Sequence, residues 1–270
     1  MAERLKLLSW NVAGHRLKMP AQAEAVSRHE PDVVALQEVT EERRSHWSHH
    51  LREDGLEHFA DSSYLLSGRP KQTFVASRWP LVTLPAIPAP QPERVLSVVI
   101  ESPWGQIEVH NAHVPNGSTY GLVKVATFEA MHERLARPCD RHRILCGDLN
   151  APQEEGPNGE VVTFAGDHPR HAERWDAAER SVLTGLAEWD LADLYRSLHG
   201  YGPSEATWER SKRRGSVGRR LDHVFASASL GGIACDYHHA WREAKLSDHS
   251  AVEAVFEPAV LARPRLRRKG

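Results

Sequence analysis

The sequence predicts an α/β sandwich, in which two mixed β-sheets pack face to face and helices cover their outer sides. Two observations carry this prediction. Some apolar strands are joined by tight turns, and others are separated by helix-like segments. The clearest hairpin joins residues 95–101 to 106–113 through Pro103-Trp104-Gly105. No shift in composition marks a boundary, so we expect a single domain over residues 1–260.

The first half of the chain alternates strands and helices. A strand over 5–12 precedes a helix over 20–30, which Pro31 ends. The apolar residues 33–36 form a short strand that runs into Gln37 and Glu38, and a second helix opens at Thr40. We expect a strand over 73–77 and then a proline-rich connector over 80–92, before the hairpin.

The second half follows the same alternation around one long loop. Helices are expected over 120–135, 177–189 and within 190–198, and strands over 143–146, 221–225 and 250–256. The segment 151–176 is rich in Pro, Gly, Glu and His, with one strand-like piece at 161–164, and loops of this length are often functional. Residues 210–220 form a basic loop, and the basic tail 261–270 is expected to be disordered.

The composition excludes several classes of protein. Three cysteines without a CxxC pair argue against a disulfide framework and against a zinc site. The start of the chain does not resemble a signal or transit peptide, and no apolar run is long enough to span a membrane, so we expect a cytoplasmic location. A net charge of −2 means that any contact with nucleic acid is local. No obligate protein partner is evident.

Polar side chains recur where the predicted strands end. Asp148 and Asn150 are one residue apart after an apolar strand, so their side chains point to the same side. The other residues of this kind are Asn11, Glu38, His113, Asn116, Asp222, Asp248 and His249. Carboxylate and amide oxygens are the ligands that Mg²⁺ prefers, and a histidine with a carboxylate partner suits proton transfer. The pattern indicates a metal-assisted catalytic site at one rim of the sheets.

Five short motifs resemble the signatures of the endonuclease/exonuclease/phosphatase superfamily, and they occur in that family's order. They are Ser9-Trp10-Asn11-Val12, Leu36-Gln37-Glu38, Gly147-Asp148-Leu149-Asn150, Arg220-Leu221-Asp222-His223 and Leu246-Ser247-Asp248-His249. The resemblance implies a four-layered αββα sandwich that cleaves phosphoester bonds with Mg²⁺, or with Mn²⁺ as an alternative.

The same resemblance implies a role for each motif. Asn11 and Glu38 are expected at the metal, with Glu38 as the main ligand. Asp248 is expected to orient the site or a second metal. Asp148 is expected to position or deprotonate the attacking water, and Asn150 to hold the phosphate. His249, paired with Asp222, is expected to contact the phosphate.

The residues that distinguish subfamilies favour no single branch. His113 and Asn116 lie where abasic-site endonucleases of the exonuclease III type carry Tyr-x-Pro-Asn, and a histidine there is similar to deoxyribonuclease I and to the phosphatase and lipid branches. His113 is therefore a candidate to protonate the leaving oxygen. Before Leu221, abasic-site enzymes present an aromatic wall, whereas this chain has Arg219 and Arg220.

The main hypothesis is a nuclease that cleaves DNA or RNA, because the basic loop adjoins the site. Asn116, Arg213, Arg214, Arg219 and Arg220 are its predicted substrate contacts. Two alternatives stay open at this point. One is a phosphatase or phosphodiesterase of small molecules or lipid head groups. The other is a catalytically silent module that binds nucleic acid.

Overall fold

The computed structural model describes residues 4–14, 17–65, 71–202, 204–212 and 215–260. Two of the predicted substrate contacts, Arg213 and Arg214, lie outside the described residues. The predicted disordered tail, 261–270, lies outside them as well.

The first of two six-stranded sheets holds both ends of the described chain. Its strands lie in the order β15-β16-β1-β2-β4-β3. Their bounds are β1 Leu5–Asn11, β2 Val33–Thr40, β3 His58–Asp61, β4 Lys71–Ser77, β15 Gly232–His238 and β16 Ala251–Phe256. β1 and β2 are parallel, so Asn11 and the end of β2 reach the same edge of the sheet.

The second sheet holds the predicted hairpin and the strand that leads to Asp148. Its order is β11-β14-β8-β7-β6-β5. The bounds are β5 Leu81–Thr83, β6 Val95–Ser102, β7 Gly105–His113, β8 His142–Asp148, β11 Ala192–Asp193 and β14 Asp222–Ala226. β7 and β8 are parallel and place His113 beside Asp148, while antiparallel β14 places Asp222 on the other side of Asp148.

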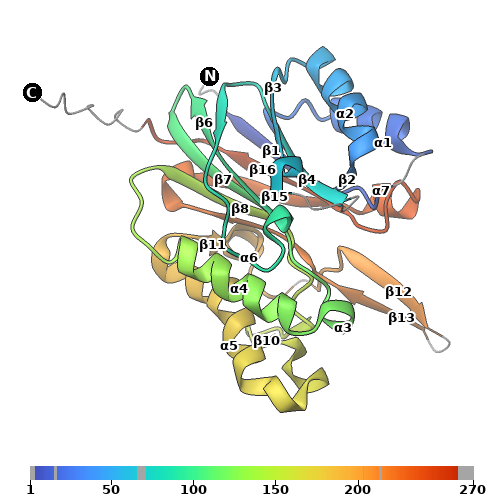
Figure 1. Ribbon diagram of the computed structural model, residues 1–270, viewed down its shortest axis with the longest axis vertical. Helices are drawn as coiled ribbons and strands as arrows, with labels where there is room; N and C mark the ends of the chain where they lie inside the picture. Colours follow the sequence, from blue (N-terminus) through green and yellow to red (C-terminus); the bar gives the residue numbers. More distant parts are fainter. Residues whose placement is uncertain (1–3, 15–16, 66–70, 203, 213–214, 261–270) are drawn as a thin grey trace, which may run out of the picture.

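The helices cover the outer faces of the two sheets and complete four layers (Figure 1). The α-helices are α1 Met19–Ser27, α2 Glu41–Glu53, α3 Gly117–Tyr120, α4 Leu122–Leu135, α5 Ala172–Leu183, α6 Leu194–His199 and α7 His239–Glu243. Apolar side chains of α1 and α2 pack on the first sheet, and those of α4 and α5 pack on the second. A third apolar cluster fills the space between the sheets, with Leu7, Val109 and Cys146 among its members. The predicted α/β sandwich with four layers is therefore confirmed.

Most of the predicted elements are present, with three corrections. Residues 210–220, predicted as a loop, belong mainly to a hairpin of β12 Trp208–Lys212 and β13 Gly215–Arg219, which projects from the sandwich (Figure 1). The helix predicted over 177–189 begins earlier, at Ala172, and ends at Leu183, before a 3₁₀ turn over Gly185–Trp189. Gly185 favours this early end because glycine has a low helix propensity.

The third correction concerns strands that the sequence did not predict, which are β15, β3 and, within the predicted connector over 80–92, β5. The Gly231-Gly232 pair at the start of β15 carries little strand signal, and a register shift lies between Gly232 and Ala234. In the long segment 151–176 the structure places two short paired strands, β9 Glu154–Glu155 and β10 Val161–Val162.

Among the described residues, no helix has the length and apolar character needed to cross a membrane. The cytoplasmic location stays a prediction.

Candidate active site

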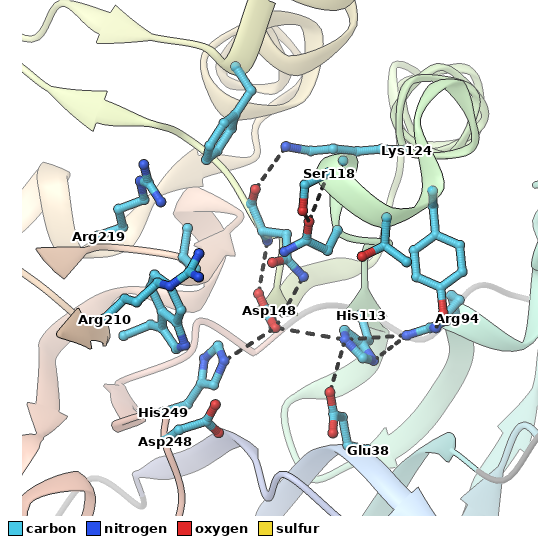
Figure 2. Close-up of a pocket in the computed structure, with 18 of the residues that line it drawn as sticks. Glu38, Arg94, His113, Ser118, Lys124, Asp148, Arg210, Arg219, Asp248 and His249 are labelled. Carbon is cyan, nitrogen blue, oxygen red and sulfur yellow. Dashed lines mark hydrogen bonds and ion pairs between the residues drawn. The ribbon is translucent and has the colours of Figure 1, made fainter. Parts of the chain in front are cut away.

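The strand ends of both sheets meet at one cavity of about 1120 Å³. Figure 2 shows that Glu38, His113, Asp148, Asp248 and His249 face its floor. The sequence therefore identified the residues that gather there, although they come from four separate segments of the chain.

Glu38 faces the cavity because β2 is irregular at this residue. Its φ of 61° is in the left-handed region, and the pairing of β2 with β4 shifts register between Leu36 and Val39. Such a bulge turns a side chain out of the regular alternation. The Asn111 amide stabilises the bulge by donating hydrogen bonds to the carbonyl oxygens of Leu36 at 2.9 Å and Phe74 at 3.0 Å.

Asp148 lies at the end of β8, where the chain bends sharply. Gly147 has a φ of 125°, and a Cβ there would lie 2.0 Å from the carbonyl oxygen of Ala112, so only glycine fits. Asn150 has a φ of 50°, and its backbone N–H donates to Oδ1 of Asp148 at 2.9 Å. This turn holds the Asp148 carboxylate, which is 1% exposed, toward the cavity floor.

Oδ2 of Asp148 is the point on which four side chains converge. The amide of Asn11 donates to it at 3.0 Å and that of Asn150 lies at 3.4 Å. Nε2 of His249 lies 3.7 Å away, and Nε2 of His113 lies 3.8 Å away. Burial raises the pKa of Asp148 to about 7, and the charge of Asp222 adds to this effect while His249 opposes it.

His249 is held on its other side by Asp222. Nδ1 of His249 donates to Oδ2 of Asp222 at 2.8 Å. Burial alone would lower the pKa of His249, but the charges of Asp222 and Asp148 outweigh it and raise the pKa to about 10. His249 is therefore an imidazolium at neutral pH.

His113 has the opposite electrostatic environment. Arg94 donates a hydrogen bond to its Nδ1 at 2.8 Å, and the Arg94 guanidinium lies over the ring of Tyr120. Burial, followed by the charges of Arg94 and His249, lowers the pKa of His113 well below its usual value. His113 is therefore neutral at neutral pH. This disfavours the predicted role of His113 as a proton donor to the leaving oxygen, since a neutral imidazole is a far weaker acid than an imidazolium.

Arg94 and a second cation, Lys124, were missed by sequence reasoning. The ammonium of Lys124 is 2.6 Å from the Glu179 carboxylate and donates to the carbonyl oxygen of Asn150 at 2.8 Å. It also lies 4.2 Å from the centre of the Phe164 ring. A lysine in the apolar face of α4 was the available signal, since such a residue is rarely buried without a partner.

The predicted substrate contacts fall into two groups. Arg219 lines the cavity together with Arg210 and Trp208, and its guanidinium lies 5.0 Å from the Phe164 ring. Asn116 lines it too, with its Oδ1 accepting from the backbone N–H of Ser118 at 2.9 Å. Arg220 belongs to the other group, because it does not line the cavity.

The Arg220 guanidinium points away from the cavity into a buried ion cluster. It lies 2.6 Å from Glu155 and 2.7 Å from Asp193, and its side chain is 2% exposed. Both carboxylates already satisfy its charge, so Arg220 is not available to a substrate.

The donor set at the cavity fits a hard divalent cation. The Glu38 and Asp248 carboxylates line the same cavity, and the Lys71 ammonium pairs with Glu38, which shows that a positive charge is stable there.

Asn11, which the sequence placed at the metal, is not among the residues that line the cavity. Its Oδ1 accepts from the backbone N–H of Ala13 at 3.0 Å and its amide holds Asp148, so it acts on Asp148 rather than facing the cavity.

A second group, Asp148, Asp222 and His249, brings its ligand atoms within 4.8 Å of one another. Since Nδ1 of His249 is engaged by Asp222, this group fits proton transfer and anion binding better than it fits a cation.

A buried carboxylate with a pKa near neutrality, an imidazolium beside it and carboxylate oxygens for a cation are suited to the hydrolysis of phosphoric esters. The chain belongs to the endonuclease/exonuclease/phosphatase family, whose model matches residues 8–249, and it is a metal-dependent hydrolase of that family.

Two curated proteins are similar to the chain over most of its length. The chain is 25% identical to exodeoxyribonuclease III of Haemophilus influenzae, over 94% of this chain and all of that one. It is 26% identical to a DNA-(apurinic or apyrimidinic site) endonuclease of Dictyostelium discoideum, over 84% of this chain and 63% of that one.

Solved structures share the fold. An AP endonuclease from Archaeoglobus fulgidus superposes with a TM-score of 0.71 and 21% identity, over 93% of this chain and 99% of that one. A 3′ phosphatase from Neisseria, bound to a product DNA hairpin, superposes with a TM-score of 0.62 and 19% identity, over the same shares.

Proposed function

We propose that the protein is a Mg²⁺-dependent nuclease that hydrolyses phosphoester bonds in DNA. The observation that carries this proposal is the cavity wall beside Asp148. Arg210 and Arg219 line it, and no carboxylate among the described residues pairs with either guanidinium. Unpaired guanidiniums suit the phosphates of a polyanion better than an uncharged head group. The named relatives that act on DNA support the same substrate.

The side chains at the cavity floor divide the chemistry among them. Asp148, with its raised pKa, accepts a proton from the attacking water, and Asn11 and Asn150 orient its carboxylate. The His249 imidazolium, held by Asp222, stabilises the negative charge that develops on the phosphate oxygens. Asn116 and Asn150 present further polar groups at the cavity wall.

Neutral His113 contributes a hydrogen bond rather than a proton. Arg94 donates to Nδ1 at 2.8 Å and lies 3.3 Å from Nε2, and Nε2 also faces Glu38 at 3.6 Å and Asp148 at 3.8 Å. We assign His113 to orienting these two carboxylates or to contacting a substrate oxygen.

Glu38 and Asp248 would hold the metal, and Mg²⁺ is favoured because both donors are hard oxygens. When bound, Mg²⁺ neutralises phosphate charge and makes a coordinated water more acidic. Glu38→Gln should weaken Mg²⁺ binding in calorimetry while the circular dichroism spectrum stays unchanged. Unchanged Mg²⁺ affinity in Glu38→Gln would exclude Glu38 as a ligand. Mn²⁺ is the alternative metal to test in parallel.

A second candidate activity is removal of a 3′-terminal phosphate from DNA. Arg219 favours it, because a guanidinium in the wall beside Leu221 suits a charged terminal phosphate better than the neutral sugar of an abasic site. The Neisseria 3′ phosphatase has the same fold.

One panel separates these activities. It contains an intact duplex, an abasic duplex, a 3′-phosphate duplex, single-stranded DNA, RNA, an inositol phosphate and a nitrophenyl phosphoester, each with Mg²⁺ or with chelator. We expect the DNA substrates to be hydrolysed when Mg²⁺ is present and not when the chelator is present. Turnover confined to the inositol phosphate or the nitrophenyl ester would overturn the nuclease proposal, and binding of DNA with no turnover of any substrate would indicate a silent module.

A further inference from the structure

We propose that His29, His238 and Glu253 form a second metal site, suited to Zn²⁺, on the outer face of the first sheet. The site is separate from the catalytic cavity, since none of its three residues lines that cavity. Their ligand atoms all lie within 4.8 Å of one another.

The fold brings these residues together from distant parts of the sequence. Glu253 of β16 pairs with Asp236 of β15, and side chains two residues apart on a strand point to the same face. His238, two residues after Asp236, therefore shares a face with Glu253. His29 follows the end of α1, which packs on this face.

The distances are compatible with a tetrahedral ion. Nδ1 of His29 lies 2.7 Å from Oε2 of Glu253, and Nε2 of His238 lies 3.5 Å from the same oxygen. A tetrahedral Zn²⁺ with bonds of about 2.0–2.2 Å separates its ligand atoms by roughly 3.3 Å. The His238 distance is close to this value, and the His29 distance is shorter by about 0.6 Å, so His29 would have to move away from Glu253 by about that amount to accommodate the ion.

His238 supplies an independent observation. Its Nε2 is shielded from solvent and makes no hydrogen bond among the described residues, although it points toward Glu253. Buried polar atoms normally have a partner, and a metal ion would provide one here. The ring of His238 is fixed by stacking on Trp241, with the ring centres 4.8 Å apart and the planes 19° from parallel.

The charge balance favours a metal that accepts nitrogen ligands. Burial would raise the pKa of Glu253, but the nearby imidazoles of His238 and His29 and the charge of Lys6 outweigh it and lower the pKa, so the carboxylate is ionised. Two imidazoles and one carboxylate suit Zn²⁺, whereas Mg²⁺ prefers oxygen donors. The two metals would thus select different sites on the same protein.

A bound ion would link α1 to β15 and β16. An ion that binds only the folded protein stabilises it by mass action. Since His238 immediately precedes α7 and the segment that leads to Asp248 and His249, the linkage also anchors the start of a catalytic segment.

Zn²⁺ titration in competition with a chromophoric chelator tests the proposal, with thermal unfolding as a second measurement. The full chain is compared with His238→Ala and Glu253→Gln, all in excess Mg²⁺. The matched control is the double variant His49→Ala/His50→Ala, which removes a different pair of histidines, also beside a glutamate.

We expect the unmodified protein and the control to bind one additional Zn²⁺ that the two test variants do not bind. If the variants still bind it, their affinity should be weaker by about tenfold or more. Zn²⁺ should raise Tm in the first two proteins only. Equal stoichiometry and affinity in all four proteins would overturn the proposal. If His238→Ala fails to fold, Glu253→Gln decides alone, because its amide preserves the shape of the carboxylate.

Discussion

Arg94 donates a hydrogen bond to Nδ1 of His113 over 2.8 Å, and the same guanidinium nitrogen lies 3.3 Å from Nε2 of that ring. The two histidines of the site therefore differ in charge, because Asp222 holds His249 as an imidazolium while Arg94 keeps His113 neutral. The difference is set by the partner of each Nδ1, a carboxylate in one case and a guanidinium in the other.

Arg94→Met should raise the pKa of His113, because the change removes a neighbouring positive charge and frees Nδ1. Histidine NMR signals followed from about pH 5 to 8 should show a ring that titrates only in the variant. We expect kcat/KM to fall about tenfold or more. Tyr120→Phe, which keeps the contact of Arg94 with His113, is the control. A His113 that titrates normally in the unmodified protein would contradict this account.

Asp148→Asn should abolish turnover while DNA binding persists, because the amide keeps the shape of the carboxylate but accepts no proton. A loss of kcat of about 10²–10⁴-fold is expected for a group that transfers a proton. Single-turnover kinetics and a binding assay on the same duplex measure the two effects. Asp167→Asn changes another carboxylate of the cavity and should retain activity. Equal losses of binding and turnover would indicate that Asp148 binds the substrate or the metal and does not accept the proton.

Asn111→Leu should affect both stability and metal binding, since Asn111 supports the bulge at Glu38. The carbonyl oxygens of Leu36 and Phe74 would lose a partner, at about 1–3 kcal/mol for each group left unpaired. Denaturant unfolding and Mg²⁺ calorimetry measure the two effects. Ser97→Ala removes a different buried hydrogen bond, to His110, and should lower stability without changing Mg²⁺ affinity. Normal Mg²⁺ binding in Asn111→Leu would show that the bulge persists without Asn111.

The double variant Arg210→Ala/Arg219→Ala should flatten the dependence of DNA affinity on salt. Each phosphate contact on duplex DNA contributes a slope of about −0.9, so two lost contacts should change the slope by about 1.8. Hydrolysis of a nitrophenyl phosphoester should hardly change. Arg28→Ala/Arg174→Ala removes two exposed arginines that pair with glutamates and do not line the cavity. A salt slope equal to that of the control would show that the cavity wall does not contact DNA phosphates.

Glu155→Gln should destabilise the protein and reduce its sensitivity to acid. Burial would raise the pKa of Glu155, but Arg220 and Arg196 outweigh it and lower the pKa to about 2. A carboxylate with a depressed pKa stabilises the fold above its ordinary pKa of about 4.3, and this contribution is lost as pH falls toward 2.

At pH 7 the variant should lose about 3–5 kcal/mol of unfolding free energy, because it leaves a buried guanidinium partly unpaired. Denaturant unfolding at several pH values should show the difference from the unmodified protein narrowing between about pH 4.5 and pH 2. A difference that stays constant with pH would show that Glu155 is not charged in the folded protein.

The sequence identified residues whose chemistry is visible in a short motif. Asp148 and Asn150 are one residue apart after an apolar strand, and Asp248 and His249 are adjacent, so each pair could be found without knowledge of the fold. Arg94 and Lys124 could not be found in this way. Arg94 contacts His113 and Lys124 contacts Asn150. These contacts exist only once the segment before β6 is packed beside β7, and α4 beside the end of β8.

In the basic segment 210–220, the sequence predicted too many substrate contacts rather than too few. Its arginines look equivalent in the sequence, yet the structure turns neighbouring Arg219 and Arg220 to opposite sides. Side chains alternate along an extended chain, so one guanidinium faces the cavity and the next enters a buried cluster with Glu155 and Asp193. The alternation was hidden because glycine, serine and arginine carry little strand signal.

Asp222 belongs to the second sheet, whereas His249 lies two residues before β16 of the first. Asn11 of the first sheet donates a hydrogen bond to Asp148 of the second. The catalytic groups are thus complete only when the two halves of the sandwich are docked. Enzymatic activity is consequently a reporter of sheet docking during refolding, and a compact intermediate with both sheets formed but not yet docked would be inactive.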